Sequence, residues 1–134
     1  MRTIQRCIFS AAILLAVALP SGCSKKSTSP QMQPLITNNP GDFTYQGLNV
    51  QAKTGLETYA WQSSGDSASV NQTSNVSSGF MTLTIQDAVG IQVYQHSLTD
   101  QGTFATARGN AGTWTIRIDY AHASGRVTFR VQKV

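Results

Sequence analysis

Cysteine and histidine are the side chains of this 134-residue chain best suited to nucleophilic or metal chemistry, and it has two of each. The two histidines, His96 and His122, lie far apart and match neither an HxH nor an HExxH zinc spacing. No GxSxG, Walker-type or GxGxxG pattern occurs either. The sequence therefore predicts no catalytic residues and no metal site, and we expect that the protein is not an enzyme.

Carboxylates offer a second kind of chemistry, calcium binding, which needs several oxygen ligands. Asp87 and Asp100 could converge from two loops, but no DxDxD run accompanies them. Asp87 also opens the segment Asp87-Ala88-Val89-Gly90, and an Asp first with a Gly last is typical of a type I turn. We therefore expect the turn, and not a bound ion, to account for Asp87.

Cys23 follows a segment with the three parts of a secretory signal. Two arginines lie within the first six residues, and an apolar run extends from Ile8 to Leu19. A helix that spans a bilayer needs about 20 apolar residues, so this run is too short. It ends in the helix-breaking and small residues 20–22. We predict that residues 1–22 are a signal peptide, helical in its apolar part and removed on export.

The residues around the cleavage site, Leu19-Pro20-Ser21-Gly22-Cys23, resemble the lipobox of bacterial lipoproteins. In that family a large aliphatic residue and two small residues precede the modified cysteine. Ser21, Gly22 and Cys23 match this pattern, whereas Pro20 holds the place of the aliphatic residue, which stands one position earlier as Leu19.

The resemblance implies that the Cys23 thiol receives a diacylglycerol and that the new amino group is acylated. No other cofactor is expected. Two or three acyl chains anchor a protein stably at a membrane. Because an Asp after the cysteine favours the inner membrane in enterobacteria, Ser24 favours the outer membrane; the side that the domain faces stays open. Ordinary secretion with a free Cys23 is the alternative.

Removal of the signal would take Cys7 and two arginines with it and leave eight Lys and Arg against six Asp and Glu, a net charge of +2. Two of these positive charges, Lys25 and Lys26, directly follow the anchor, where they can touch anionic headgroups. Such a balance does not predict a nucleic-acid partner. The expected partners are the membrane, through the lipid, and an envelope protein or glycan.

Residues 23–41 comprise the lipidated cysteine and a segment rich in Ser, Pro, Asn and Gln, in which three prolines exclude a helix. We predict a disordered, flexible linker there. From Asp42 to Val134 apolar residues alternate with polar ones, and Gly or Asn/Asp/Ser clusters interrupt the pattern about every ten residues. This spacing predicts an all-β domain, an antiparallel β-sandwich of about eight strands that is jelly-roll-like.

Two hairpins are expected. In the first, strands 113–120 and 126–132 are joined by a turn at 121–125, so that Ile118 faces Val127. A shift by two residues would place Arg117 opposite Arg130 and is disfavoured by their like charges. The second joins strand 81–86 to strand 91–97 through the turn at Asp87. The weaker strands expected are 43–50, 57–62, 68–72 and 103–107.

The C-terminal segments 112–117 and 124–131 also resemble the closing hairpin of small exported β-sandwich domains, of which the pre-peptidase C-terminal-like domains are one group. This resemblance implies an accessory β-sandwich without catalytic residues.

Aromatic side chains on strands are the remaining candidates for binding. Trp61 and Trp114 share faces with other apolar residues and are predicted to lie in the core. If Ile91 and Val93 point inwards, Tyr94 points outwards with Gln92 and His96, and these three form a polar and aromatic strip, our candidate binding residues. The sequence thus predicts a non-catalytic cell-envelope lipoprotein whose β-sandwich is a binding or structural module. A lipid-tethered carbohydrate-binding module is the alternative.

Overall fold

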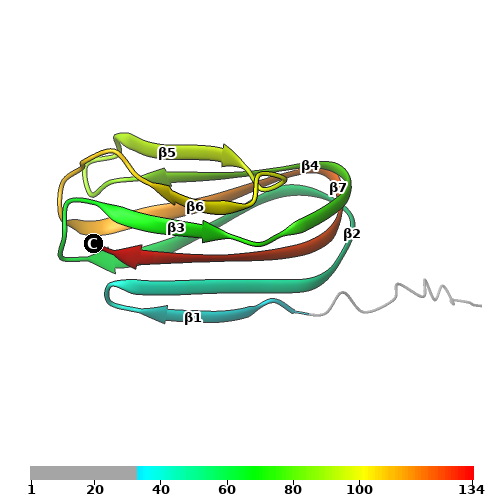
Figure 1. Cartoon of the computed structure of the whole chain (residues 1–134), viewed down its shortest axis with the longest axis horizontal. Coiled ribbons are helices and arrows are strands. Elements are labelled where there is room, and N and C mark those ends of the chain that lie inside the picture. Colours follow the sequence, from blue (N-terminus) through cyan, green and yellow to red (C-terminus); the bar gives the residue numbers. More distant parts are fainter. Residues whose placement is uncertain (1–32) are drawn as a thin grey trace, which may run out of the picture. The chain divides into compact units, whose positions relative to one another are not determined.

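The structure is a computed structural model that describes residues 33–134, and this part of the chain is all-β and antiparallel, as predicted. Residues 1–32, with the predicted signal peptide and Cys23, lie outside the described residues. Within residues 33–134 no helix is long and apolar enough to cross a membrane. Figure 1 shows the seven strands: β1 (Leu35–Asn39), β2 (Asp42–Ser63), β3 (Ala68–Gln72), β4 (Asn75–Gln86), β5 (Gln92–Ser97), β6 (Gly102–Ala105) and β7 (Gly112–Lys133).

Two strands of 22 residues each, β2 and β7, organise the sheet. They pair antiparallel along their whole length, from Asp42 opposite Gln132 to Ser63 opposite Gly112. β1 pairs with the other edge of β2, and β3 and β4 both pair with the other edge of β7. β6 then adds to β3 and β5 adds to β4. The C-terminal strand therefore lies in the middle of the sheet.

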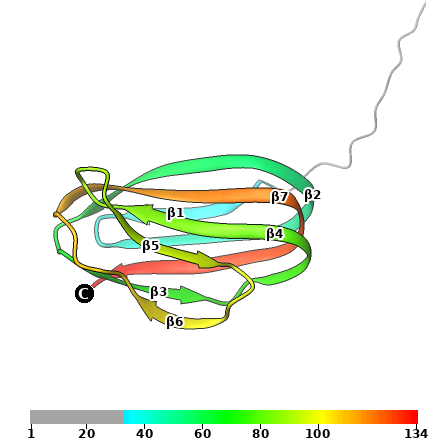
Figure 2. The ribbon, with the colours of Figure 1, turned by 90° about the horizontal axis from the view of Figure 1, so that it is seen from above.

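The sheet bends sharply where three strands cross from one layer to the other (Figure 1 and Figure 2). The pairing register of β2 shifts between Gly47 and Gly55, and that of β4 shifts between Val76 and Phe80. In one layer lie β1, the first half of β2, the second half of β7, β3 and β6. In the other lie the second half of β2, the first half of β7, β4 and β5. We call this crossing, formed by residues 47–55, 76–80 and 121–125, the bend.

The predicted C-terminal hairpin is wrong. Residues 112–133 form one strand, in which Ile118 pairs with both Glu57 and Leu83, and Val127 pairs with Gly47. His122 and Gly125 have positive φ angles of 48° and 133°, and they bend the strand between layers without reversing it. The segments expected as strands 43–50 and 57–62 are likewise two halves of β2. The eight expected strands thus correspond to six, and β1, which was not expected, is the seventh strand of the described residues.

The other hairpin is confirmed. β4 and β5 are antiparallel neighbours, and the amide of Gly90 donates to the carbonyl of Asp87 at 3.1 Å, which closes the turn. Gly90 has a φ of 90°, a conformation that glycine adopts at little cost. The predicted strand 68–72 is β3, and the strand expected at 103–107 is the shorter β6.

Strand β1 lies within the segment that we expected to be a flexible linker. Leu35 pairs with Gln46 and Asn39 with Asp42, so the folded part begins before Asp42. The pairing satisfies backbone groups at the edge of β2, which would otherwise be left open, and Ile36 packs against the core. These two gains outweigh the polar composition of the segment.

Aromatic rings fill the space between the layers. Trp61 and Trp114 are fully buried, as predicted, and their rings meet edge to face with centroids 5.8 Å apart. The indole N–H of Trp61 donates to the carbonyl of Asn39 at 3.1 Å, which ties the two layers together at one side of the sheet. Tyr45 and Phe129 stack at 5.3 Å in the same core.

Candidate functional site

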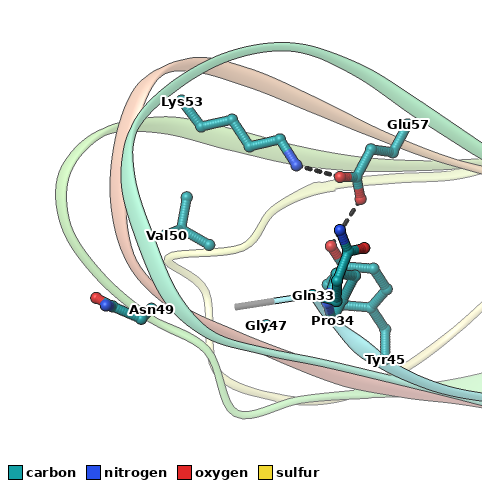
Figure 3. A pocket seen from close by; sticks show the side chains of 8 residues that line it. All are labelled: Gln33, Pro34, Tyr45, Gly47, Asn49, Val50, Lys53 and Glu57. Atoms are coloured by element: carbon teal, nitrogen blue, oxygen red, sulfur yellow. Dashed lines mark hydrogen bonds and ion pairs between the residues drawn. The ribbon is translucent and has the colours of Figure 1, made fainter. Parts of the chain in front are cut away.

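A hollow of about 250 Å³ lies beside the bend, and it contains the main cluster of titratable side chains near the core (Figure 3). Most of the residues that line the hollow belong to β2 and lie on both sides of the bend. The hollow therefore forms where β2 bends from one layer to the other. The lining residues are Gln33, Pro34, Tyr45, Gly47, Asn49, Val50, Lys53 and Glu57.

Glu57 is the centre of this cluster. Its Oε1 accepts hydrogen bonds from the hydroxyls of Tyr45 at 2.6 Å, Tyr59 at 3.1 Å and Tyr120 at 3.4 Å. Its Oε2 forms an ion pair with the ammonium of Lys53, and Figure 3 shows these two side chains pointing toward one another. We call these five residues the Glu57 cluster.

The bend explains why these residues meet. Glu57 and Tyr59 lie on the second half of β2 with alternate side chains facing inwards, Tyr45 lies on its first half, and Tyr120 comes from β7 directly before the crossing. The hydroxyls of Tyr45 and Tyr120 are also 2.9 Å apart. A carboxylate that loses water on burial is thus given donors in its place, which is the condition for burying a charge.

The protonation states follow from these contacts. Burial raises the pKa of Glu57, but the hydrogen bonds from Lys53 and Tyr45 outweigh it and hold the pKa below its usual range. Burial, followed by the hydrogen bond to Glu57, raises the pKa of the Tyr45 hydroxyl, and burial raises that of Tyr120. Burial and the nearby carboxylate raise the pKa of Tyr59 to about 12. Near neutral pH the carboxylate is charged and the tyrosines are protonated.

This arrangement favours binding over proton transfer. All the Glu57 contacts are internal, and the ammonium of Lys53 also lies 4.4 Å from the centre of the Tyr120 ring, a cation–π contact. The side chains of Lys53 and Glu57 are only partly exposed. Asn49 points away from the ion pair, while Gln33 lies beside Tyr45 and Glu57 (Figure 3). The hollow is therefore lined by one ammonium group and by the side-chain amides of Gln33 and Asn49.

The predicted binding strip on β5 does not form, because Tyr94 is buried and only 4% exposed. Ile85 pairs with Tyr94 but the next residue, Gln86, pairs with Gln92. Val93 is therefore the extra residue of a β-bulge, and both Val93 and Tyr94 face the core. The expected outward orientation of Tyr94 is wrong, and its hydroxyl instead donates to Oε1 of buried Gln72 at 2.6 Å.

The other two residues of the strip are separated from one another. Gln92 is exposed at the start of β5. The ring of His96 stacks on Tyr94 at 4.8 Å and on Phe104 at 4.4 Å, so it packs against β6. His96 is thus a partly exposed packing residue. The second histidine, His122, lies at the bend, where its amide donates to the Thr54 hydroxyl at 3.0 Å.

Asp87 has more contacts than the turn requires. It is 2% exposed, and its Oδ1 accepts the amides of Val89 and Ile91 while its Oδ2 accepts both the amide and the side-chain Nδ2 of Asn110. Burial opposes the charged form, but these hydrogen bonds outweigh it and lower the pKa of Asp87 to about 2. Within residues 33–134 no three His, Cys, Asp or Glu side chains are placed to hold a metal ion, and the oxygens of Asp87 already have partners.

Sequence reasoning missed the Glu57 cluster, although one signal was present. Glu57 has the same parity in its strand as the aromatic residue Tyr59 and as Trp61, which was predicted to lie in the core. A charged residue on an apolar strand face indicates a buried, partnered carboxylate. Its partners could not be identified, because Tyr45 and Tyr120 approach through the bend.

Replacement of Glu57 by Gln should lower the free energy of unfolding by about 2 kcal/mol, because Lys53 and the three tyrosine hydroxyls would lose a charged acceptor. Urea unfolding followed by tryptophan fluorescence measures this change. Tyr59→Phe removes one hydrogen bond of the same cluster and should cost less than about 1 kcal/mol. Equal losses in the two variants would show that the charge of Glu57 contributes nothing.

Comparisons with known proteins give little to set beside this geometry. No family model and no curated protein match the chain. Its strands are similar to those of a chain in the crystal structure of accessory secretory protein 1, 2 and 3 in Streptococcus pneumoniae. The identity is 10% and the TM-score 0.38, over 81% of this chain and 90% of that one. At this level of similarity the neighbour indicates neither the function nor the partners of this chain. Any inference about function therefore depends on the all-β fold and the side-chain contacts described above.

Proposed function

We propose that this protein is a non-catalytic lipoprotein of the cell envelope, anchored through lipid on Cys23, whose domain is a β-sandwich that binds a small polar ligand at the bend. The observation that carries the anchor is the sequence Leu19-Pro20-Ser21-Gly22-Cys23 after a short apolar run. Ser24 supports the outer membrane over the inner one.

Two features of the domain support the proposal that it is a β-sandwich held close to a membrane. The two layers and their closed aromatic core support a jelly-roll-like sandwich. Eleven residues separate Cys23 from Leu35, the first residue of β1, so the proposed anchor and the folded domain are close along the chain.

The Glu57 cluster supports binding in preference to catalysis. A general acid or base works best with a pKa near the ambient pH, whereas the pKa of Glu57 is lowered and those of its tyrosines are raised. The hollow beside it is small and polar, which favours a ligand with a few hydrogen-bonding groups.

The carbohydrate-binding alternative has less support. Such modules present flat aromatic rings to a sugar, but both tryptophans are buried and Phe80 is the one aromatic residue that is largely exposed within residues 33–134. We therefore favour an envelope module without an aromatic sugar platform.

The anchor has a direct test. Cys23→Ala should move nearly all of the protein from the membrane fraction to the soluble fraction and abolish incorporation of labelled palmitate, because the thioether can form only at this thiol. Ser24→Ala keeps the thiol and should stay in the membrane fraction with its label. A Cys23→Ala protein that remains at the membrane, together with a wild type that takes up no palmitate, would contradict the proposal.

A further inference from the structure

The folded part of the chain begins at the bend. Leu35, the first residue of β1, pairs with Gln46, and the register of β2 breaks directly after that, at Gly47. In Figure 1 the start of β1 and the bend lie at the same end of the domain. Eleven residues, 24–34, connect Cys23 to Leu35, and even fully extended this connection spans only about 40 Å. A lipid on Cys23 would therefore hold this end of the domain near the bilayer surface.

Exposed apolar side chains gather at this same end. Single exposed apolar residues are common and need no explanation, but four large ones surround the bend. Leu48 lies inside the register shift of β2, Leu56 follows Gly55, and Phe80 lies opposite Ala121 where β4 crosses β7. Their exposed fractions, with that of Leu35 at the chain entry, are 51% for Leu48, 53% for Leu56, 73% for Phe80 and 66% for Leu35.

The charges at the bend are also suited to a lipid surface. Arg126 is exposed and has no ion-pair partner among the described residues. It lines a shallow groove of about 460 Å³ together with Leu48 and Ser77. The nearby carboxylates are occupied, since Glu57 pairs with Lys53 and Asp119 lies 3.2 Å from the Nε of Arg117. The bend therefore presents an unpaired positive charge beside apolar side chains, the combination that binds anionic headgroups.

We propose that the bend lies against the anionic bilayer surface in which the protein is anchored, with Phe80, Leu48 and Leu56 in the headgroup region and Arg126 among lipid phosphates. This inference rests on the proposed lipid anchor at Cys23. The opposite end, which carries the exposed Val89 and Ile91 of the β4–β5 turn, points away from the membrane. The hollow beside the bend consequently opens near the lipid surface.

The test uses the full-length, lipidated protein in vesicles of phosphatidylglycerol and phosphatidylcholine that contain brominated lipid. Ser78→Cys places one fluorophore at the bend without changing the apolar residues, and Val89→Cys places it at the opposite end. Both sites are exposed, and acylation blocks the thiol of Cys23. Brominated lipid should quench the label at position 78 at least threefold more than the label at position 89.

The two proposals fail in distinguishable ways. If the protein does not float with the vesicles, the anchor fails and the orientation fails with it. If it floats and both labels are quenched equally, the anchor stands and the orientation is wrong. Adding Phe80→Ser and Arg126→Glu to the Ser78→Cys protein should at least halve the quenching. Adding Val89→Ser and Ile91→Ser should leave it unchanged, and the reverse pattern would place the opposite end at the membrane.

Discussion

Gly125→Ala is expected to lower the free energy of unfolding by about 4 kcal/mol, and Gly55→Ala by only about 1–2 kcal/mol. Both glycines are in the left-handed region, with φ angles of 133° and 139°. A methyl group at Gly125 would overlap the carbonyl oxygen of Asn75 and approach the amide of Ser77 to 2.9 Å, whereas a methyl group at Gly55 would meet nothing within 4 Å. Comparison of the two variants therefore separates the energetic cost of backbone strain from the cost of the steric contact between β7 and β4.

Urea unfolding followed by tryptophan fluorescence measures both variants, since Trp61 and Trp114 are buried. The φ contribution is common to both, so the difference of about 2–3 kcal/mol reports the close approach of the two strands at the bend. If the two substitutions cost the same, β4 and β7 do not lie this close, and the description of the bend is wrong.

Asp87→Asn should lower the melting temperature by roughly 10 °C at pH 7, although the two side chains have nearly the same shape. Each carboxylate oxygen of Asp87 accepts two N–H groups. An Asn has one acceptor oxygen, and its NH₂ group would face either the turn amides or the two donors of Asn110. Two hydrogen bonds would be lost and donors would face donors.

The effect of Asp87→Asn should depend on pH. The folded pKa of Asp87, about 2, is below the ordinary value of 3.8, so the charged carboxylate stabilises the fold above pH 4 and this contribution is lost as the pH falls toward 2. The difference between wild type and variant should shrink over that range in thermal melts. Asp66→Asn is the matched control, because Asp66 is largely exposed and lies 3.7 Å from exposed Arg108. It should change the melting temperature by less than about 2 °C.

What the sequence predicted correctly depends on local patterns. Alternation of apolar and polar residues identified most of the strand segments after Asp42 and the burial of Trp61 and Trp114, and the Asp87 to Gly90 spacing identified the turn. These features depend on residues that are close along the chain. The path of the chain at residues 121–125 depends on distant residues instead, because a His and a Gly with positive φ can either reverse a strand or bend it. The strand bends here because β2 pairs with β7 on both sides of these residues.

The candidate site shows the same limit. One extra residue, Val93, turned Tyr94 from the surface to the core, because a bulge changes the face of every residue on one side of it. Alternation alone cannot locate such a bulge when both neighbours are apolar. Glu57 could have been recognised as a buried charge, but two of the three hydroxyls that stabilise it, those of Tyr45 and Tyr120, come from strand segments that only the bend brings together.

The central position of β7 has a consequence for when the protein can fold. Paired residues of β2 and β7 are separated along the chain by between 49 residues, for Ser63 and Gly112, and 90 residues, for Asp42 and Gln132. β7, which follows the other six strands along the described chain, also fills the place between β2 and the strands β3 and β4. The earlier strands consequently have no continuous sheet to join until β7 is present, and pairing over such separations is slow. The sheet of this domain can therefore be completed only when β7 has been synthesised.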